Sequence, residues 1–131
     1  NVQKFSGLVP GIVEEAWFSV HSGQPLFLVG GFGGAARAVC DILAGHPRED
    51  LTESWLSRKL SNYDSAKAYY EAHGKAFRSV EQLCAEMKER ASSGLAKALN
   101  NGLDESENQE LMQCTDAQRI ARLVLLGLER L

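Results

Sequence analysis

Four glycines within five residues form the part of this sequence best suited to binding an anion. Gly30, Gly31, Gly33 and Gly34 surround Phe32 and follow directly on a short apolar run. A turn without Cβ atoms lets backbone N–H groups approach an oxyanion closely. A helix after the turn adds the unpaired donors of its first turn and the positive end of its dipole. The turn therefore predicts a phosphate site, and close packing between a strand and a helix is the alternative explanation for the same glycines.

Three charged residues near helix starts are candidates to assist such a site. Arg37 falls in the first turn of the helix after the glycines, where it could contact a phosphate or simply be a surface arginine. Glu14 and Glu15 fall in the first turn of an earlier helix. One of them could contact a ligand ribose while the other interacts with the helix dipole, or both could serve the dipole alone. The sequence alone does not decide between ligand contact and a purely structural role for any of these three residues.

Other residue types that could support chemistry are scattered. The histidines lie on three separate segments without a partner four residues away, which favours surface or packing roles: His21, His46 and His73. The cysteines are far apart, which indicates buried thiols in a reducing compartment: Cys40, Cys84 and Cys114. No Gly-x-Ser-x-Gly motif occurs. We therefore expect no metal site and no catalytic residue.

The elements that position the glycine turn are predicted from hydrophobic periodicity. A helix leads into a strand over residues 25–30, and a helix over 33–44 follows the glycines. Helix is predicted as the dominant class from residue 51 to the end. The predicted fold class is α/β, a partial Rossmann-like unit with one or two parallel strands and a helix-dominated C-terminal two-thirds. One strand cannot make a sheet, so we expect a segment outside this chain to complete it.

Capping patterns locate several of the later helices. Ser79 and Gln82 have the spacing of a capping box, as do Thr115 and Gln118 before the last helix. Asp104 is predicted to begin a short acidic helix. The apolar stripe that starts at Val80 continues past residues 92–94, so one helix is expected to run through that weak point.

Composition limits the class of protein and its partners. The 131 residues are 44% apolar, which is enough for one core. We predict a single domain or fragment, 1–131. It divides into a glycine-rich nucleotide-binding half, 1–45, and a helical part packed on it, 46–131. The net charge of −3 and the lack of a basic block argue against nucleic-acid and anionic-membrane partners. No apolar run reaches the roughly 18–20 residues that span a bilayer. We expect a cytoplasmic protein and, because the chain begins at Asn1, a trimmed chain or fragment.

Two motifs are similar to segments of the SLOG family, Rossmann-like nucleotide-binding domains related to LOG-type phosphoribohydrolases and to the N-terminal region of TRPM channels. One is the segment 10–16, which contains Gly11, Glu14 and Glu15. The other is the segment 28–36 with the glycine turn, and residues 102–128 resemble the C-terminal helices of some bacterial members. The resemblance is sharpest over residues 7–40. It implies the C-terminal half of such a domain and adds Gly11 to the expected ligand-binding residues.

The LOG enzymes, which the turn resembles, carry Gly-Gly-x-Gly-Thr-x-x-Glu at this position, where the glutamate serves N-glycosidic cleavage. Gly30, Gly31 and Gly33 match that pattern, but Gly34 stands at the threonine position and Arg37 at the glutamate position. A cation can neither stabilise a developing ribosyl oxocarbenium ion nor accept a proton. The resemblance therefore implies phosphate binding without hydrolysis.

These observations predict a sensor module that binds a nucleotide or a nucleotide derivative at residues 30–34. The resemblance implies an NAD-derived, ADP-ribose-like or cyclic nucleotide ligand and a place in a larger bacterial stress or anti-phage signalling protein. The expected partners are this ligand, an upstream part of the same protein or another domain, and further copies of the chain in a homo-oligomer. Two alternatives remain: a nucleoside monophosphate phosphoribohydrolase that uses Glu14 or Glu15, and a ligand-free helical interaction domain.

Overall fold

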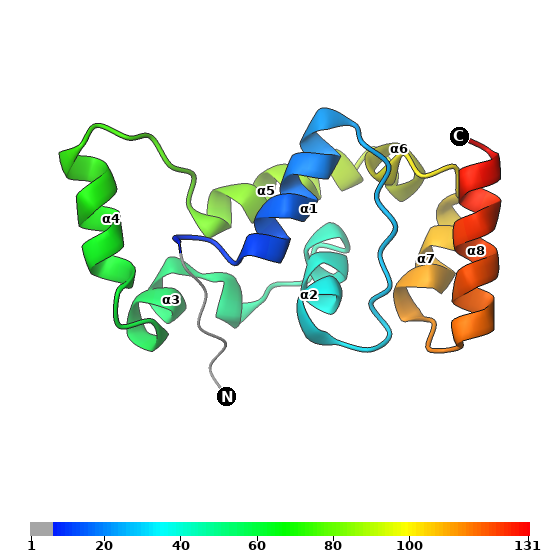
Figure 1. The fold of residues 1–131 in the computed structure, drawn as a ribbon, viewed down its shortest axis with the longest axis horizontal. Coiled ribbons are helices and arrows are strands. Elements are labelled where there is room, and N and C mark those ends of the chain that lie inside the picture. Colours follow the sequence, from blue (N-terminus) through cyan, green and yellow to red (C-terminus); the bar gives the residue numbers. More distant parts are fainter. Residues whose placement is uncertain (1–6) are drawn as a thin grey trace.

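A computed structural model describes residues 7–131, and within them the chain is helical (Figure 1). The elements are α1 Gly11–Ser22, α2 Gly34–Leu43, the 3₁₀ helix η1 Glu49–Leu51, α3 Glu53–Lys59, α4 Tyr63–Ala72, α5 Val80–Ala91, α6 Leu95–Leu99, α7 Glu105–Gln113 and α8 Ala117–Glu129. The predicted helix after the glycine turn and the helical class beyond residue 50 are confirmed. The predicted α/β class is wrong, because the described residues contain no strand and no sheet.

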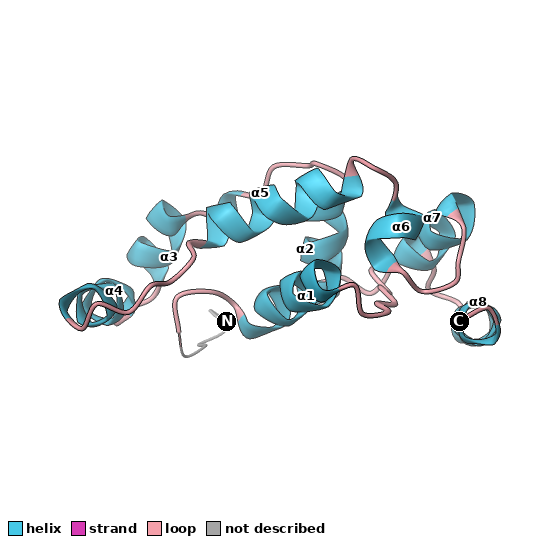
Figure 2. Cartoon of the chain, turned by 90° about the horizontal axis from the view of Figure 1, so that it is seen from above, coloured by secondary structure: helices cyan, strands magenta, loops and turns pink. Residues whose placement is uncertain are grey.

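Three helices form the centre of the molecule. α1, α2 and α5 pack against one another around the larger core, in which Val13, Val39 and Met87 are almost fully buried. α3 and α4 extend from one end of this group, while α6, α7 and α8 lie at the other end (Figure 2). A second, smaller core lies between the last helices and contains Leu103, Leu111 and Leu123.

The segment predicted as a strand, residues 25–30, connects these two cores without being a strand. Leu26 and Leu28 pack with the larger core, whereas Phe27 and Val29 pack with the smaller one. The strand was predicted from the continuous apolar run 26–29, and such a run also describes a non-helical segment with an apolar environment on both sides. The segment runs alone from the end of α1 to the foot of α2 (Figure 1).

Backbone partners explain why no sheet forms there. The N–H of Leu26 donates to the carbonyl of Leu99 at the end of α6, 2.9 Å away. The carbonyl of Leu26 accepts from the side-chain amide of Asn101 at 2.8 Å. A helix end and a buried side chain thus satisfy backbone groups that a sheet would otherwise pair. The α/β prediction failed because it assumed a neighbouring strand for this role.

The helix boundaries confirm some capping predictions and correct others. Ser79 and Gln82 form the predicted capping box at the start of α5. At α8 the cap is Asp116, whose carboxylate accepts from the N–H of Arg119 at 2.9 Å, so the prediction of Thr115 was wrong. The expected helix through residues 92–94 is also broken. Gly94 has a φ of +113°, which a right-handed helix cannot contain, and α6 starts directly after it.

None of the helices in residues 7–131 is both long enough and apolar enough to cross a bilayer.

Candidate functional site

The glycine turn lies at the N-terminal end of α2 (Figure 1). The N–H of Gly33 donates to the carbonyl of Gly30 at 3.1 Å, which closes a four-residue turn, and α2 begins at Gly34. Phe32 is at the tip of the turn with 69% of its surface exposed. The predicted order of an apolar segment, a tight turn and a helix is therefore present, with the helix N-terminus next to the last two glycines.

The first two glycines are required by packing. A Cβ on Gly30 would lie 2.6 Å from the Sγ of Cys40 in α2 and 2.6 Å from the carbonyl oxygen of Met112 in α7. A Cβ on Gly31 would overlap the carbonyl of Cys114 and lie 2.8 Å from that of Gln113. Real Cβ atoms do not approach a backbone so closely. For this half of the turn, close packing by itself accounts for the glycines, and one of the packed partners is the end of α7.

The last two glycines are required by backbone conformation instead. Gly33 and Gly34 have φ values of +83° and +64°, and a Cβ on either would meet no heavy atom of the described chain within 4 Å. Only glycine adopts such angles without strain. The space beside these two residues is therefore open, in contrast to the space beside Gly30 and Gly31.

The start of α2 adds donors to this open side. Its N-cap is Gly33, and within the part of the chain that the structure describes no side chain caps it. The N–H groups of Gly34, Ala35 and Ala36 fall in the first turn, where a helix offers no carbonyl acceptor of its own. Unpaired donors at the positive end of a helix dipole, next to the open space at Gly33 and Gly34, are suited to an anion.

Arg37 lies in the first turn of α2 but reaches away from the glycines. Its Nε donates to Asp41, one turn further along the helix, at 2.9 Å. Asp41 also accepts a hydrogen bond from Arg48 at 2.7 Å, and Arg48 donates two further hydrogen bonds to the carboxylate of Asp50. The hydrogen bond to Asp50, with that to Asp41, raises the pKa of the Arg48 guanidinium above its usual value. Arg37 is thus the outer member of an ion-pair chain.

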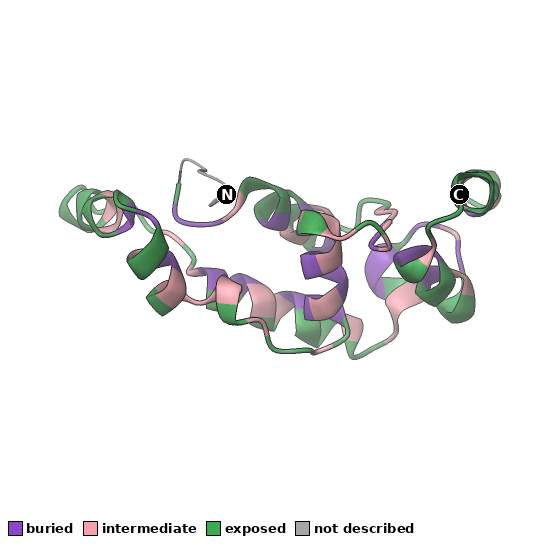
Figure 3. Ribbon diagram, turned by 90° about the horizontal axis from the view of Figure 1, so that it is seen from below, coloured by how far each residue is buried: buried purple, intermediate pink, exposed green. Residues whose placement is uncertain are grey.

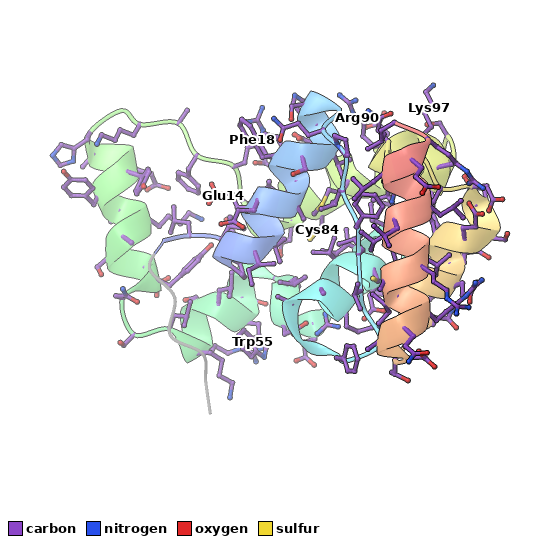
Figure 4. The ribbon with its side chains drawn as sticks, turned by 45° about the vertical axis from the view of Figure 1, so that its right-hand side comes forward. Glu14, Phe18, Trp55, Cys84, Arg90 and Lys97 are labelled. Atoms are coloured by element: carbon purple, nitrogen blue, oxygen red, sulfur yellow. The ribbon has the colours of Figure 1, made fainter. Side chains whose placement is uncertain are left out.

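The predicted residues of α1 are not brought to the glycine turn by any contact among residues 7–131. Glu14 lines a hollow of about 370 Å³ together with Trp17, Tyr70, Phe77 and other residues of the N-terminal loop and of α5. Figure 4 shows Glu14 on the side of α1 that faces the chain between α4 and α5. Gly11 and Glu15 are exposed on the same helix. A ribose contact from these residues to a ligand at the turn has no support in the geometry.

A polar cluster between α1 and α5 was missed by the sequence analysis. The indole N–H of Trp17 donates to Glu86 at 2.7 Å, the Arg78 guanidinium lies 4.8 Å from the Trp17 ring, and His21 stacks on the same ring at 4.9 Å. Glu86 lies 69 residues from Trp17 in the chain, so no local signal could have revealed that contact, whereas His21 is on the same helix.

The cysteines lie in different environments. Cys40 is buried, and Cys84 and Cys114 are half-buried. Burial raises the pKa of the Cys40 thiol to about 11. The pKa of Cys84 is also raised to about 11, mainly by burial and to a smaller extent by the negative charge of the nearby Glu81. Both side chains are therefore neutral thiols at ordinary pH, and Cys40 serves as the packing partner of Gly30.

Comparison with known families accounts for most of the chain. A family model described as SLOG cluster2 matches residues 1–111. The chain therefore belongs to the SLOG cluster2 family, as the resemblance of its two motifs implied. This membership indicates a nucleotide-related domain, and the matched region includes the whole glycine turn but ends before α8. The searches of curated proteins and of solved structures gave no match.

Proposed function

We propose that this protein binds the phosphate of a nucleotide or nucleotide derivative at the open half of the glycine turn. The observation that carries the proposal is the pair Gly33 and Gly34. Both have positive φ, and among residues 7–131 no atom fills the space beside them and no side chain caps the helix that starts there. The family match supports a nucleotide as the source of the phosphate.

In this arrangement the backbone does most of the binding. The N–H groups of Gly34, Ala35 and Ala36 donate to the phosphate oxygens, at the roughly 2.7–3.1 Å typical of such bonds. Phe32, exposed at the tip of the turn, offers an apolar ring to the nucleobase. Arg37 joins the phosphate by leaving Asp41. Asp41 keeps its hydrogen bond from Arg48 when Arg37 leaves.

The ligand class follows from the resemblance to sensor members of the family. We infer an NAD-derived nucleotide, such as an ADP-ribose-like molecule, or a cyclic nucleotide, recognised by a sensor module of a larger bacterial signalling protein. The alternative, cleavage of a nucleoside monophosphate, would need a carboxylate at the turn. Arg37 stands where that carboxylate would be, and Glu14 lines a separate hollow.

The test compares two glycines that both have positive φ. Gly74, after α4, has a φ of +60° and, like Gly33, no described heavy atom within 4 Å of its missing Cβ. Gly33→Val and Gly74→Val therefore each put a branched side chain on a positive-φ residue, in two separate parts of the molecule. Calorimetric titration with ADP-ribose, NAD, AMP and cyclic nucleotides should show binding to the parent and to Gly74→Val, and none to Gly33→Val. Equal binding by a folded Gly33→Val protein would contradict the proposal, as would a parent that binds none of these nucleotides.

A further inference from the structure

The C-terminal helix α8 has an apolar surface that the described chain leaves uncovered. Leu123 and Gly127 face inward and are buried, whereas Leu125 and Leu128 are 59% and 52% exposed. Residues 123–128 read Leu-Val-Leu-Leu-Gly-Leu, so this part of the helix is apolar on nearly all sides. A helix with that composition is normally buried on more than one face.

The position of α8 makes the uncovered face accessible. α8 lies at one edge of the molecule, packed against α7 (Figure 2). Most of its residues are coloured as exposed in Figure 3. It also lies beyond residue 111, where the family match ends. The face therefore belongs to a part of this chain that family membership does not explain.

Charges on this face are arranged so that it complements itself. Gln118, Arg122, Leu125 and Glu129 are spaced by four, three and four residues, which places them along one line of the helix. Arg122 precedes the exposed Leu125, and Glu129 follows it. Neither charge has an ion-pair partner among residues 7–131, whereas the neighbouring Arg119 is paired with Glu110.

A second copy of the same helix fits this pattern in only one direction. With Leu125 near a two-fold axis, an antiparallel α8 places Arg122 of each copy opposite Glu129 of the other, which forms two ion pairs. A parallel copy would place Arg122 against Arg122. A hollow of about 320 Å³, lined by Arg122, Leu125, Leu126 and Glu129 among others, can receive a leucine from the facing helix.

We propose that α8 is the contact of a symmetric homodimer, formed by an antiparallel pair of α8 helices. Such an interface is isologous, because the same patch serves both copies. A helix of 13 residues is only about 20 Å long, so the interface is small and association depends on protein concentration. The proposal is independent of the nucleotide site, which lies at the foot of α2.

The first test measures mass against concentration by sedimentation equilibrium, from micromolar to millimolar protein. The parent should shift from monomer to dimer over this range, and Leu125→Asp should remain monomeric. Ile12→Asp is the matched control, because Ile12 is 57% exposed on α1, and it should dimerise like the parent. A parent that stays monomeric, or a Leu125→Asp protein that still dimerises, overturns the proposal.

The second test exchanges the charges. Arg122→Glu and Glu129→Arg, each alone, put like charges opposite each other and should raise the dimer Kd about tenfold or more. The double variant Arg122→Glu/Glu129→Arg restores two opposite-charge pairs and should regain most of the parent affinity. Arg122 and Glu129 are exposed, so none of these substitutions should destabilise the monomer. Each of the three charge variants should therefore unfold at a temperature no lower than that of the monomeric Leu125→Asp variant. A double variant as weak as the two single variants overturns the antiparallel arrangement.

Discussion

The two halves of the glycine turn contain the same residue type for opposite physical reasons. At Gly30 and Gly31 there is no room for a Cβ, because Cys40, Met112 and Cys114 occupy its place. At Gly33 and Gly34 no described atom fills the space for a Cβ, and positive φ values strongly favour glycine. A run of glycines in a sequence therefore cannot be assigned as a whole to packing or to binding.

The packed half also determines where the open half lies. Gly30 and Gly31 let the turn fit between α2 and the end of α7. That contact fixes the start of α2, and hence the position of its unpaired N–H donors. Substitutions in the packed half should thus affect folding first, whereas those in the open half should affect ligand binding first. The following predictions test this division.

The largest effect is expected from Gly31→Val. Its Cβ would overlap the carbonyl of Cys114, and a backbone group cannot move aside as a flexible side chain can. We expect the free energy of unfolding to fall by about 3 kcal/mol or more, measured by urea denaturation. Gly11→Val is the control: a Cβ at Gly11 meets nothing within 4 Å among the described residues. Equal stability of the two variants would show that the turn is not packed as described.

A smaller loss of stability is expected from Gly33→Val. The cost is backbone strain alone, about 1–3 kcal/mol, because the added side chain points into open space. Thermal unfolding should also show a loss for Gly74→Val, where φ is likewise positive and the space for a Cβ is open among the described residues. A loss at Gly33 as large as that at Gly31 would remove the distinction between the two halves.

The reactivity of Cys40 should distinguish the packed half of the turn from the open half. Its pKa is raised to about 11 by burial, so the thiol is protonated and shielded at pH 8 and should resist iodoacetamide. It should remain unreactive in Gly33→Val and become reactive in Gly31→Val, as measured by peptide mapping with mass spectrometry. Alkylation of Cys40 in the folded parent would contradict the packing of Gly30 against its sulfur.

The smallest effect is expected from Arg37→Ala. Because Arg37 must leave Asp41 to reach a phosphate, its removal should weaken nucleotide binding by only about 1 kcal/mol. Titration calorimetry should detect this change, with Arg58→Ala, an exposed arginine on α3, as the neutral control. A complete loss of binding in Arg37→Ala would mean that the side chain, not the backbone of the open half, is the main phosphate ligand.

Local sequence determined much of the helical structure. The start of α2 after the glycines, the capping box at Ser79 and the helical class beyond residue 50 were predictable, because helix periodicity and capping depend on residues a few positions apart. The two motifs in residues 7–40 also predicted SLOG family membership. In each case the information lay within one short segment.

Tertiary structure decided what depends on distant residues. Residues 25–30 contain the apolar run of a buried strand, but a strand requires a neighbouring backbone, and Leu26 pairs instead with Leu99 and Asn101, more than 70 positions away. The packing of Gly30 and Gly31 depends in the same way on the distant Met112 and Cys114. The sequence by itself therefore determined where the turn is and which helix follows it. Only the packing of α7 against the turn decided which of its glycines border open space.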